Sequence, residues 1–237
     1  MNSKEIIDYL KSEASEKYKM NVVKMGIPEK FCIGVSTSTL RNLAKKTEKS
    51  NELAFELWNS HYHEARLLAV LIFDYKNITY TQIETLMTDV SSWDLCDHLC
   101  KNLIIKLPFY EDYILNWITN SHIYKKRAAF VLMASSTIHD KNLSSQKLNS
   151  YLKLIYENSY YEHDHIKKAA SWALKEIGKT DFEFTEKALL TAYDLLGSGN
   201  KAQTWVAKDV IKELESIVKV KERKRLISSN SKMGKER

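Results

Sequence analysis

The chain has 237 residues, with 36 Lys and Arg against 30 Asp and Glu, and it contains only 6 Gly, 2 Pro and 3 Cys. So few glycines and prolines exclude a β-rich protein and a low-complexity chain, and they favour helices joined by short loops. The longest apolar run, from Leu67 to Phe73, is much shorter than the roughly 20 residues that a membrane span needs, so we expect no membrane contact. No secretory signal is recognisable at the start and the cysteine count is odd, which together predict a cytoplasmic location.

The net charge of +6 is a property of the C-terminal tail alone. Residues 217–237 hold eight basic and two acidic side chains, which leaves 36 − 8 = 28 basic and 30 − 2 = 28 acidic residues in the rest of the chain. We therefore expect a neutral single domain over residues 1–216. The basic tail at 217–237 is predicted to be disordered, with an accessory nucleic-acid arm as the alternative.

Apolar residues recur at helical spacing along residues 1–216, and short polar breaks separate the segments. The pattern predicts helices, in chain order, near residues 3–17, 36–47, 51–60, 62–75, 80–89, 92–107, 110–120, 123–137, 145–158, 162–178, 182–197 and 200–216. Ser3, Ser36 and Asn51 are expected N-caps, and Gly178 is an expected helix stop. No segment alternates with a period of two, so the predicted fold class is all-α.

One stretch of the chain repeats itself. The ten residues from Lys168 match the ten from Lys201 position for position after a step of 33 residues, and the same register places Arg127 and Arg66 in the same slot. A two-helix period of this kind is typical of a solenoid. We expect a right-handed α-α superhelix of five to six helical hairpins, whose second helices line a concave face.

Two tryptophans in the matching segments lie off the apolar stripe of their helices. Each is framed by lysines: Trp172 by Lys168 and Lys175, and Trp205 by Lys201 and Lys208. One interpretation is packing against a neighbouring hairpin. The other is an exposed ring with phosphate-seeking cations, which suits contact with DNA.

Cations also gather at the starts of three predicted helices, where the helix dipole disfavours them. They are Lys125, Lys126 and Arg127, then Lys167 and Lys168, then Lys201. Helix N-termini with extra basic side chains favour phosphate binding, although plain solvated charge is an alternative.

The helix predicted at 92–107 begins with an aromatic and acidic motif. Trp93 and Asp97 are four residues apart and therefore neighbours on one helix face. Asp94 lies further round and favours the helix dipole. Arg127 stands in a helix that is apolar on nearly every side, so it needs a partner. A structural Asp97–Arg127 ion pair and an anionic site beside a phosphate-binding Arg127 are both open.

Other residue pairs do not predict a site. Cys96 and Cys100 fall on the apolar side of their helix and are expected to be buried thiols, and the spacing of two in His61-x-His63 and His163-x-His165 does not suit a ligand pair. We expect neither a metal nor another cofactor.

Taken together, four motifs resemble the AlkD-type DNA alkylation repair proteins, a family of HEAT-like repeat proteins that includes DNA glycosylases. The resemblance spans most of residues 20–216 and rests on Trp58 with His63-Glu-Ala-Arg66, on Ser92-Trp93-Asp94-Leu-Cys-Asp97, on Lys126-Arg127-Ala-Ala-Phe and on Lys167-Lys168-Ala-Ala-Ser-Trp172. It implies excision of cationic 3- and 7-alkylpurines from double-stranded DNA without extrusion of the base.

The resemblance also implies roles for single residues. Asp97 would be the catalytic anion, Trp93 and Trp172 would hold the deoxyribose, and Arg127 would fix a phosphate. Further candidate DNA contacts are Arg66, Lys125, Lys126, Lys168, Lys175, Lys201, Trp205 and Lys208.

The sequence departs from strict members of the family after the late tryptophan, where they carry Arg-Glu-Tyr and this chain has Lys175-Glu-Ile. Base excision is therefore less secure than the fold. The alternatives are a non-catalytic protein that binds DNA structures and a protein-binding solenoid. We expect a monomer.

Overall fold

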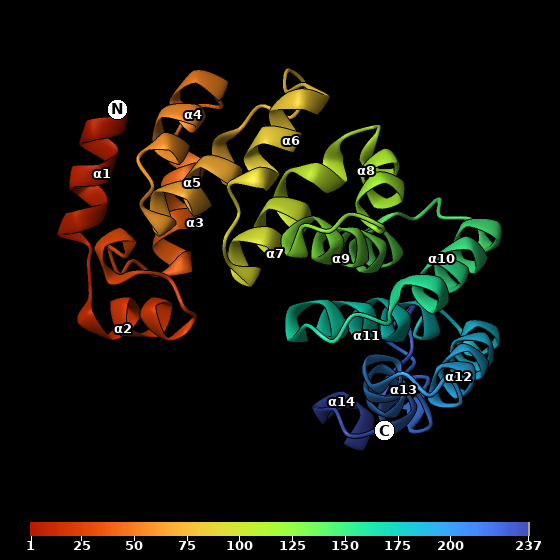
Figure 1. Ribbon diagram of the computed structural model, residues 1–237. Helices are drawn as coiled ribbons and strands as arrows, with labels where there is room; N and C mark the ends of the chain where they lie inside the picture. Colours follow the sequence, from red (N-terminus) through yellow and green to blue (C-terminus); the bar gives the residue numbers. More distant parts are fainter. Residues whose placement is uncertain (237) are drawn as a thin grey trace. The chain divides into compact units, whose positions relative to one another are not determined.

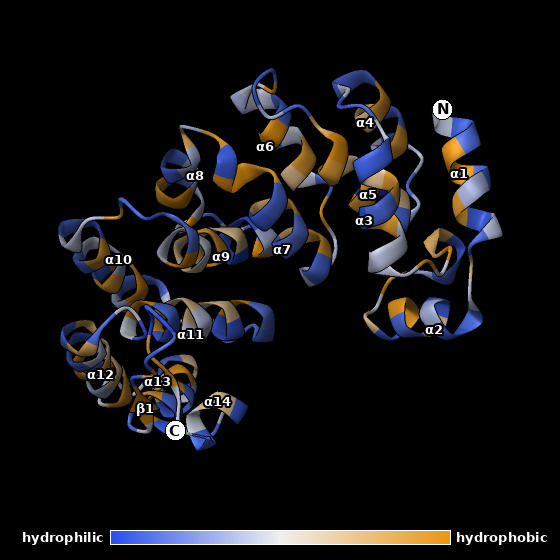
Figure 2. Ribbon diagram, turned by 180° about the vertical axis from the view of Figure 1, so that it is seen from behind, coloured by the Kyte–Doolittle hydropathy of each residue, from blue (hydrophilic) through white to orange (hydrophobic). Residues whose placement is uncertain are grey.

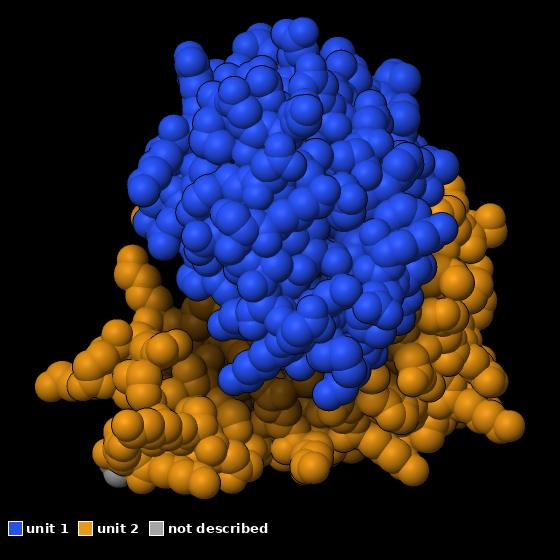
Figure 3. Space-filling model, turned by 90° about the vertical axis from the view of Figure 1, so that its left-hand side faces the viewer, with its two compact units in different colours: residues 1–110 blue, residues 111–237 orange. Residues whose placement is uncertain are grey.

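The computed structural model describes residues 1–236, and the chain is helical through most of its length (Figure 1). The helices fall into two compact units, Met1–Tyr110 and the residues from Glu111 onward, which Figure 3 colours separately. Most helices carry both hydrophobic and hydrophilic residues, as expected where one side of each helix faces a core (Figure 2). Within residues 1–236, no helix combines the length and apolar character needed to cross a membrane.

Unit 1 consists of short helices. In chain order they are α1 (Ser3–Ser12), α2 (Glu16–Lys24), the 3₁₀ turn η1 (Glu29–Phe31), α3 (Thr37–Lys46), α4 (Asn51–Asn59), α5 (His63–Ile72), α6 (Tyr80–Thr88), α7 (Trp93–Asn102) and the 3₁₀ turn η2 (Ile104–Lys106). α4 and α5 form a hairpin, and α5 packs between α3 and α7.

The first predicted helix, 3–17, is instead two helices separated near Ser15. The backbone N–H of Ser15 donates to the carbonyl of Gly34 at 2.8 Å, which brings a distant loop against the chain. Gly34 has a φ of +98°, and a Cβ there would lie 2.6 Å from the Ser15 carbonyl oxygen. The break between the two helices therefore leaves space for the loop that contains Gly34, and only glycine fits at position 34 of that loop.

Unit 2 is built around a buried helix. Its elements are α8 (Tyr110–Trp117), α9 (Ile123–His139), α10 (Ser145–Asn158), α11 (Asp164–Gly178), α12 (Phe182–Leu196), α13 (Lys201–Leu214), the strands β1 (Ile217–Val218) and β2 (Ile227–Ser228), and α14 (Lys232–Lys235). Every α9 side chain from 126 to 137 is buried. α11 packs along α9 on one side and along α13 on the other (Figure 1).

Helical hairpins in sequence order, with their second helices side by side, make up both units. α4 pairs with α5, α10 with α11, and α12 with α13, while α5 lies beside α7 and α11 lies between α9 and α13. This arrangement confirms the prediction of an all-α repeat fold.

The C-terminal segment differs from the disordered tail that its charge predicted. β1 and β2 pair antiparallel, with Val218 opposite Ile227. The chain therefore also contains a small sheet, which no alternation of apolar and polar residues predicted. Leu226 is 2% exposed, and its N–H donates to the carbonyl of Lys179 at 2.9 Å. Arg225 donates to the carbonyl of Thr137 at 2.8 Å and to the Glu176 carboxylate at 3.0 Å. One apolar anchor and one arginine thus fasten a basic segment to unit 2.

Candidate nucleic-acid interface

The first turn of α7 carries the aromatic and acidic pair of unit 1. Trp93 is half-buried, and the Asp97 side chain, one turn later, is 14% exposed. The Lys101 ammonium lies 3.9 Å from the Asp97 carboxylate, at the outer limit of an ion pair, and its side chain is 42% exposed. Such a long pair contributes little stabilisation. The Asp97 side chain is thus largely buried but still reaches solvent, one turn from the Trp93 ring.

Asp94 ties α7 to α5 rather than merely favouring the helix dipole. Its carboxylate lies 2.7 Å from Nε2 of His63, whose side chain is 4% exposed. Burial raises the pKa of Asp94, but the hydrogen bond and charge of His63, with a further hydrogen bond from Ser92, outweigh burial, and the pKa is lowered. The contact holds the N-terminus of α7, and with it Trp93, against α5.

Arg66 is a structural cation, which corrects its assignment as a DNA contact. The side chain is 9% exposed, and its Nε donates to the Trp58 carbonyl at 3.0 Å. Nη2 lies 2.9 Å from Nδ1 of His61, and the guanidinium carbon lies 5.0 Å from the centroid of the Trp58 ring. Burial lowers its pKa. With its donors used inside unit 1, Arg66 is not placed to hold a phosphate.

Lys126 requires the same correction. It is 1% exposed, its Nζ donates to the Ile118 carbonyl at 2.5 Å, and it lies 3.8 Å from the centroid of the Tyr161 ring. Burial lowers its pKa to about 8. An ammonium enclosed in this way stabilises the junction of α8, α9 and α11 and is not accessible to a DNA phosphate.

Arg127, on the next position of α9, is 6% exposed and donates from Nη1 to the carbonyl of His165 at 2.6 Å. That bond links the N-terminal turns of α9 and α11. Trp172 lies two turns further along α11 and is half-buried. Arg127 and Trp172 are thus both in unit 2, whereas Trp93 and Asp97 are in unit 1, and the convergence of all four stays a prediction.

Lys175 belongs to a network between α11 and α13. Its Nζ lies 2.9 Å from Asp209 and 3.3 Å from Glu213, and its side chain is 17% exposed. Burial lowers the pKa of Lys175, but these carboxylates outweigh burial and raise it. Two carboxylates already neutralise this lysine, so its assignment as a phosphate contact is also corrected.

The remaining predicted DNA contacts do reach the surface of unit 2. Trp205 is 37% exposed, whereas the next residue, Val206, is fully buried, as the helix projection predicts. The ammonium of Lys167 lies 5.5 Å from the centroid of the Trp205 ring. The other predicted cations on these helices are exposed or half-buried: Lys125, Lys168, Lys201 and Lys208.

Sequence reasoning missed the histidines that begin α9 and α11. His122 caps α9 by accepting the Lys125 N–H on Nδ1 at 3.3 Å, and His163 caps α11 by accepting the His165 N–H at 3.2 Å. Both stand five residues before the repeated cation slot, at Arg127 and at Lys168. This shared spacing is a visible signal in the sequence, but His163 was considered only as a metal ligand and His122 was not considered.

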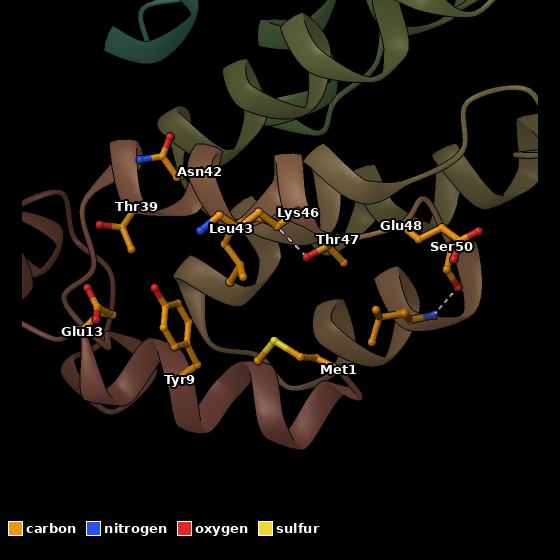
Figure 4. Close-up of a pocket in the computed structure, with 11 residues that line it drawn as sticks. Met1, Tyr9, Glu13, Thr39, Asn42, Leu43, Lys46, Thr47, Glu48 and Ser50 are labelled. Atoms are coloured by element: carbon orange, nitrogen blue, oxygen red, sulfur yellow. Dashed lines mark hydrogen bonds between the residues drawn. The ribbon is translucent and has the colours of Figure 1, made fainter.

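A cavity of about 740 Å³ lies elsewhere in unit 1, between α1 and the helices α3 and α4 (Figure 4). Its wall includes Tyr9, Glu13, Lys46 and Glu48, and none of the predicted site residues lines it. Its mixed charge gives it no preference for a polyanion.

The comparisons with known proteins agree with the family resemblance of the sequence. The profile of a family described as DNA alkylation repair enzyme matches residues 6–214. The chain belongs to this family. No curated protein matches the sequence significantly.

One similar solved structure is described as "A new family of proteins related to the HEAT-like repeat DNA glycosylases with affinity for branched DNA structures". It is 21% identical with a TM-score of 0.75, over 100% of this chain and 94% of that chain. At this identity the match establishes the fold, a HEAT-like helical repeat, and so confirms the predicted fold class.

Proposed function

We propose that this member of the DNA alkylation repair family binds double-stranded DNA and excises cationic alkylated purines of the 3-methyladenine and 7-methylguanine class. The observation that carries the proposal is the pairing of Trp93 with a partly accessible Asp97 on one turn of α7, one of the motifs on which the resemblance to the family rests. The cavity of unit 1 lies away from this motif, which agrees with a reaction that does not extrude the base into a pocket.

Excision of a cationic purine requires little catalytic assistance from the protein. An alkylated purine already carries positive charge, so the C1′–N bond can break with both electrons leaving on the base, which departs neutral. The sugar then bears the positive charge until water adds at C1′ and releases a proton. A carboxylate beside C1′ stabilises that cation, and Asp97 has the charge and the exposure for this role.

Unit 2 supplies groups suited to the DNA backbone. Lys168, Lys201 and Lys208 are exposed, and Trp205 lies on the same helix as the last two. Trp172 would contact deoxyribose. Arg66, Lys126 and Lys175 are not part of this proposal, because their charges are satisfied inside the protein. The predicted phosphate role of Arg127 is corrected for the same reason, because its side chain is 6% exposed and donates to the His165 carbonyl.

The test is release of free base from methylated duplex DNA, measured by mass spectrometry, for wild type, Asp97→Asn and the control Asp112→Asn, an exposed acid on α8. Loss of one electrostatic group at the reacting centre predicts a rate about 100-fold lower for Asp97→Asn. Asp112→Asn should match wild type. Equal rates for Asp97→Asn and wild type would exclude Asp97 from the chemistry.

A second candidate function is binding of DNA structures without excision. It is favoured by the solved neighbour described as having affinity for branched DNA structures. Wild type that binds DNA with steep salt dependence but releases no base would establish this candidate. Absence of any salt-dependent DNA binding, unchanged by reversing the charges of Lys168 and Lys208, would leave a protein-binding solenoid instead.

A further inference from the structure

Four aromatic rings form a row across the N-terminal ends of α9 and α11, and we name them the ring row: His122, Tyr124, His165 and His163. Successive ring centroids lie 6.3, 6.0 and 5.1 Å apart, and the planes of Tyr124 and His165 are nearly parallel, at 28°. These spacings are typical of interacting aromatic pairs. His163 is exposed and the other three rings are half-buried, so the row borders solvent.

Contacts within unit 2 hold two rings of the row and the backbone of a third residue. The carbonyl of His165 accepts from Arg127 at 2.6 Å, and His122 and His163 are each held as a helix cap through Nδ1. A rigid ring loses little entropy when a planar ligand stacks on it.

The surroundings of His122 and His165 disfavour the charged imidazolium form of both rings. Nδ1 of His122 accepts a backbone N–H, which requires that nitrogen to be unprotonated. Burial lowers the pKa of His165, as do the nearby charges of Arg127, His163 and Lys168, and burial and Lys125 lower that of His122. Tyr124 and the two imidazoles of His122 and His165 thus offer π surfaces, with separate lysines beside them.

The charges around the row suit a polyanion. Lys125 is half-buried and Lys168 is exposed, one at each helix start. Of the acids nearby, Asp164 is already paired with Lys167 at 2.9 Å, and Glu162 is exposed. Cations outnumber acids here, in a body that is otherwise balanced.

Rings flanked by cations match the two faces of a single-stranded nucleic acid, whose bases stack on aromatic side chains while its phosphates meet lysines. In an intact duplex each base face is covered by its neighbours, so only an unpaired base can stack on a ring. We propose that the ring row binds unpaired nucleotides of DNA, such as the single-stranded arm of a branched or frayed substrate. This inference rests on the proposed function, since it assumes a DNA-binding protein.

The test compares binding of a dye-labelled blunt duplex with binding of the same duplex carrying a single-stranded thymidine overhang. The variant is Tyr124→Leu with His163→Asn, because Asn also caps helices and so removes the ring while keeping the cap. The matched control is Phe182→Leu, an aromatic side chain 54% exposed at the start of α12, beyond the other end of α11. Circular dichroism checks that helix content is unchanged in both.

For wild type we expect tighter binding of the overhang duplex than of the blunt duplex. Loss of stacking predicts a dissociation constant about 5- to 50-fold higher for the variant on the overhang duplex, with the blunt duplex unaffected. Phe182→Leu should leave both unchanged. An overhang that adds no affinity to wild type, or a variant that weakens both DNAs equally or neither, would overturn the assignment while leaving the proposed function intact. Wild type that binds no DNA at all would instead overturn the proposed function.

Discussion

Glu64 is the side chain on which we expect the fold of unit 1 to depend most. It is fully buried, and its carboxylate accepts the backbone N–H groups of Ile33 at 2.9 Å, Gly34 at 2.6 Å and Val35 at 3.4 Å. In Glu64→Gln one oxygen becomes an amide N–H₂, which presents a donor to a backbone donor. A buried N–H left without an acceptor costs about 1–3 kcal/mol, so we expect a loss of about 2 kcal/mol for the loop.

That loss corresponds to local opening about 30-fold more often. Hydrogen exchange followed by mass spectrometry should show faster exchange in peptides that cover residues 33–35. Glu56→Gln, an exposed glutamate on α4, is the matched control and should exchange like wild type. Unchanged exchange of the loop in Glu64→Gln would refute the view that this carboxylate holds it.

Two further predictions concern unit 2. Asp209 accepts from Ser171 at 2.5 Å and from Lys175 at 2.9 Å, and although burial raises its pKa these bonds outweigh burial and lower it. A lowered pKa means that the stabilisation is present above the unfolded-state pKa of about 4 and is lost as pH falls through the folded-state pKa. The midpoint temperature of thermal unfolding of Asp209→Asn should therefore differ from that of wild type by a few degrees near pH 7 and converge with it in acid. A difference that persists in acid would contradict this. Arg225→Gln removes the bonds to Thr137 and Glu176, so the Leu226 amide should exchange faster than in the exposed control Arg223→Gln, and equal exchange in the two variants would show that Leu226 alone holds the segment.

The helices themselves were predictable from apolar spacing, because each needs only one face against a core. Breaks and tails were not, since they depend on partners far along the chain. The split at Ser15 requires Gly34, and the ordered tail requires Glu176 and Lys179, neither of which any local pattern announces.

The candidate site was predictable to the same degree. The projection of α13 correctly separated exposed Trp205 from buried Val206, because both facts concern one helix. The projection of α11 could not show that the Lys175 ammonium contacts Asp209 and Glu213, because those carboxylates belong to α13, in the next repeat. A single-helix projection therefore gives the side on which a cation stands but not whether its charge is already neutralised.

Whether a cation in the repeated slot is buried or exposed also depends on neighbouring helices, which a single-helix projection omits. Arg66 and Arg127 occupy it as buried guanidiniums that donate to backbone carbonyls, whereas Lys168 and Lys201 occupy it exposed. A guanidinium presents five donors and can satisfy several carbonyls when it is desolvated, while an ammonium at a surface keeps its water until a phosphate displaces it. The change from Arg to Lys along the repeats thus separates slots that hold the helices together from slots open to a ligand. The exposed lysines and the ring row both lie in unit 2, so we expect charge reversal there to alter DNA affinity and substitution of Arg66 to alter stability first.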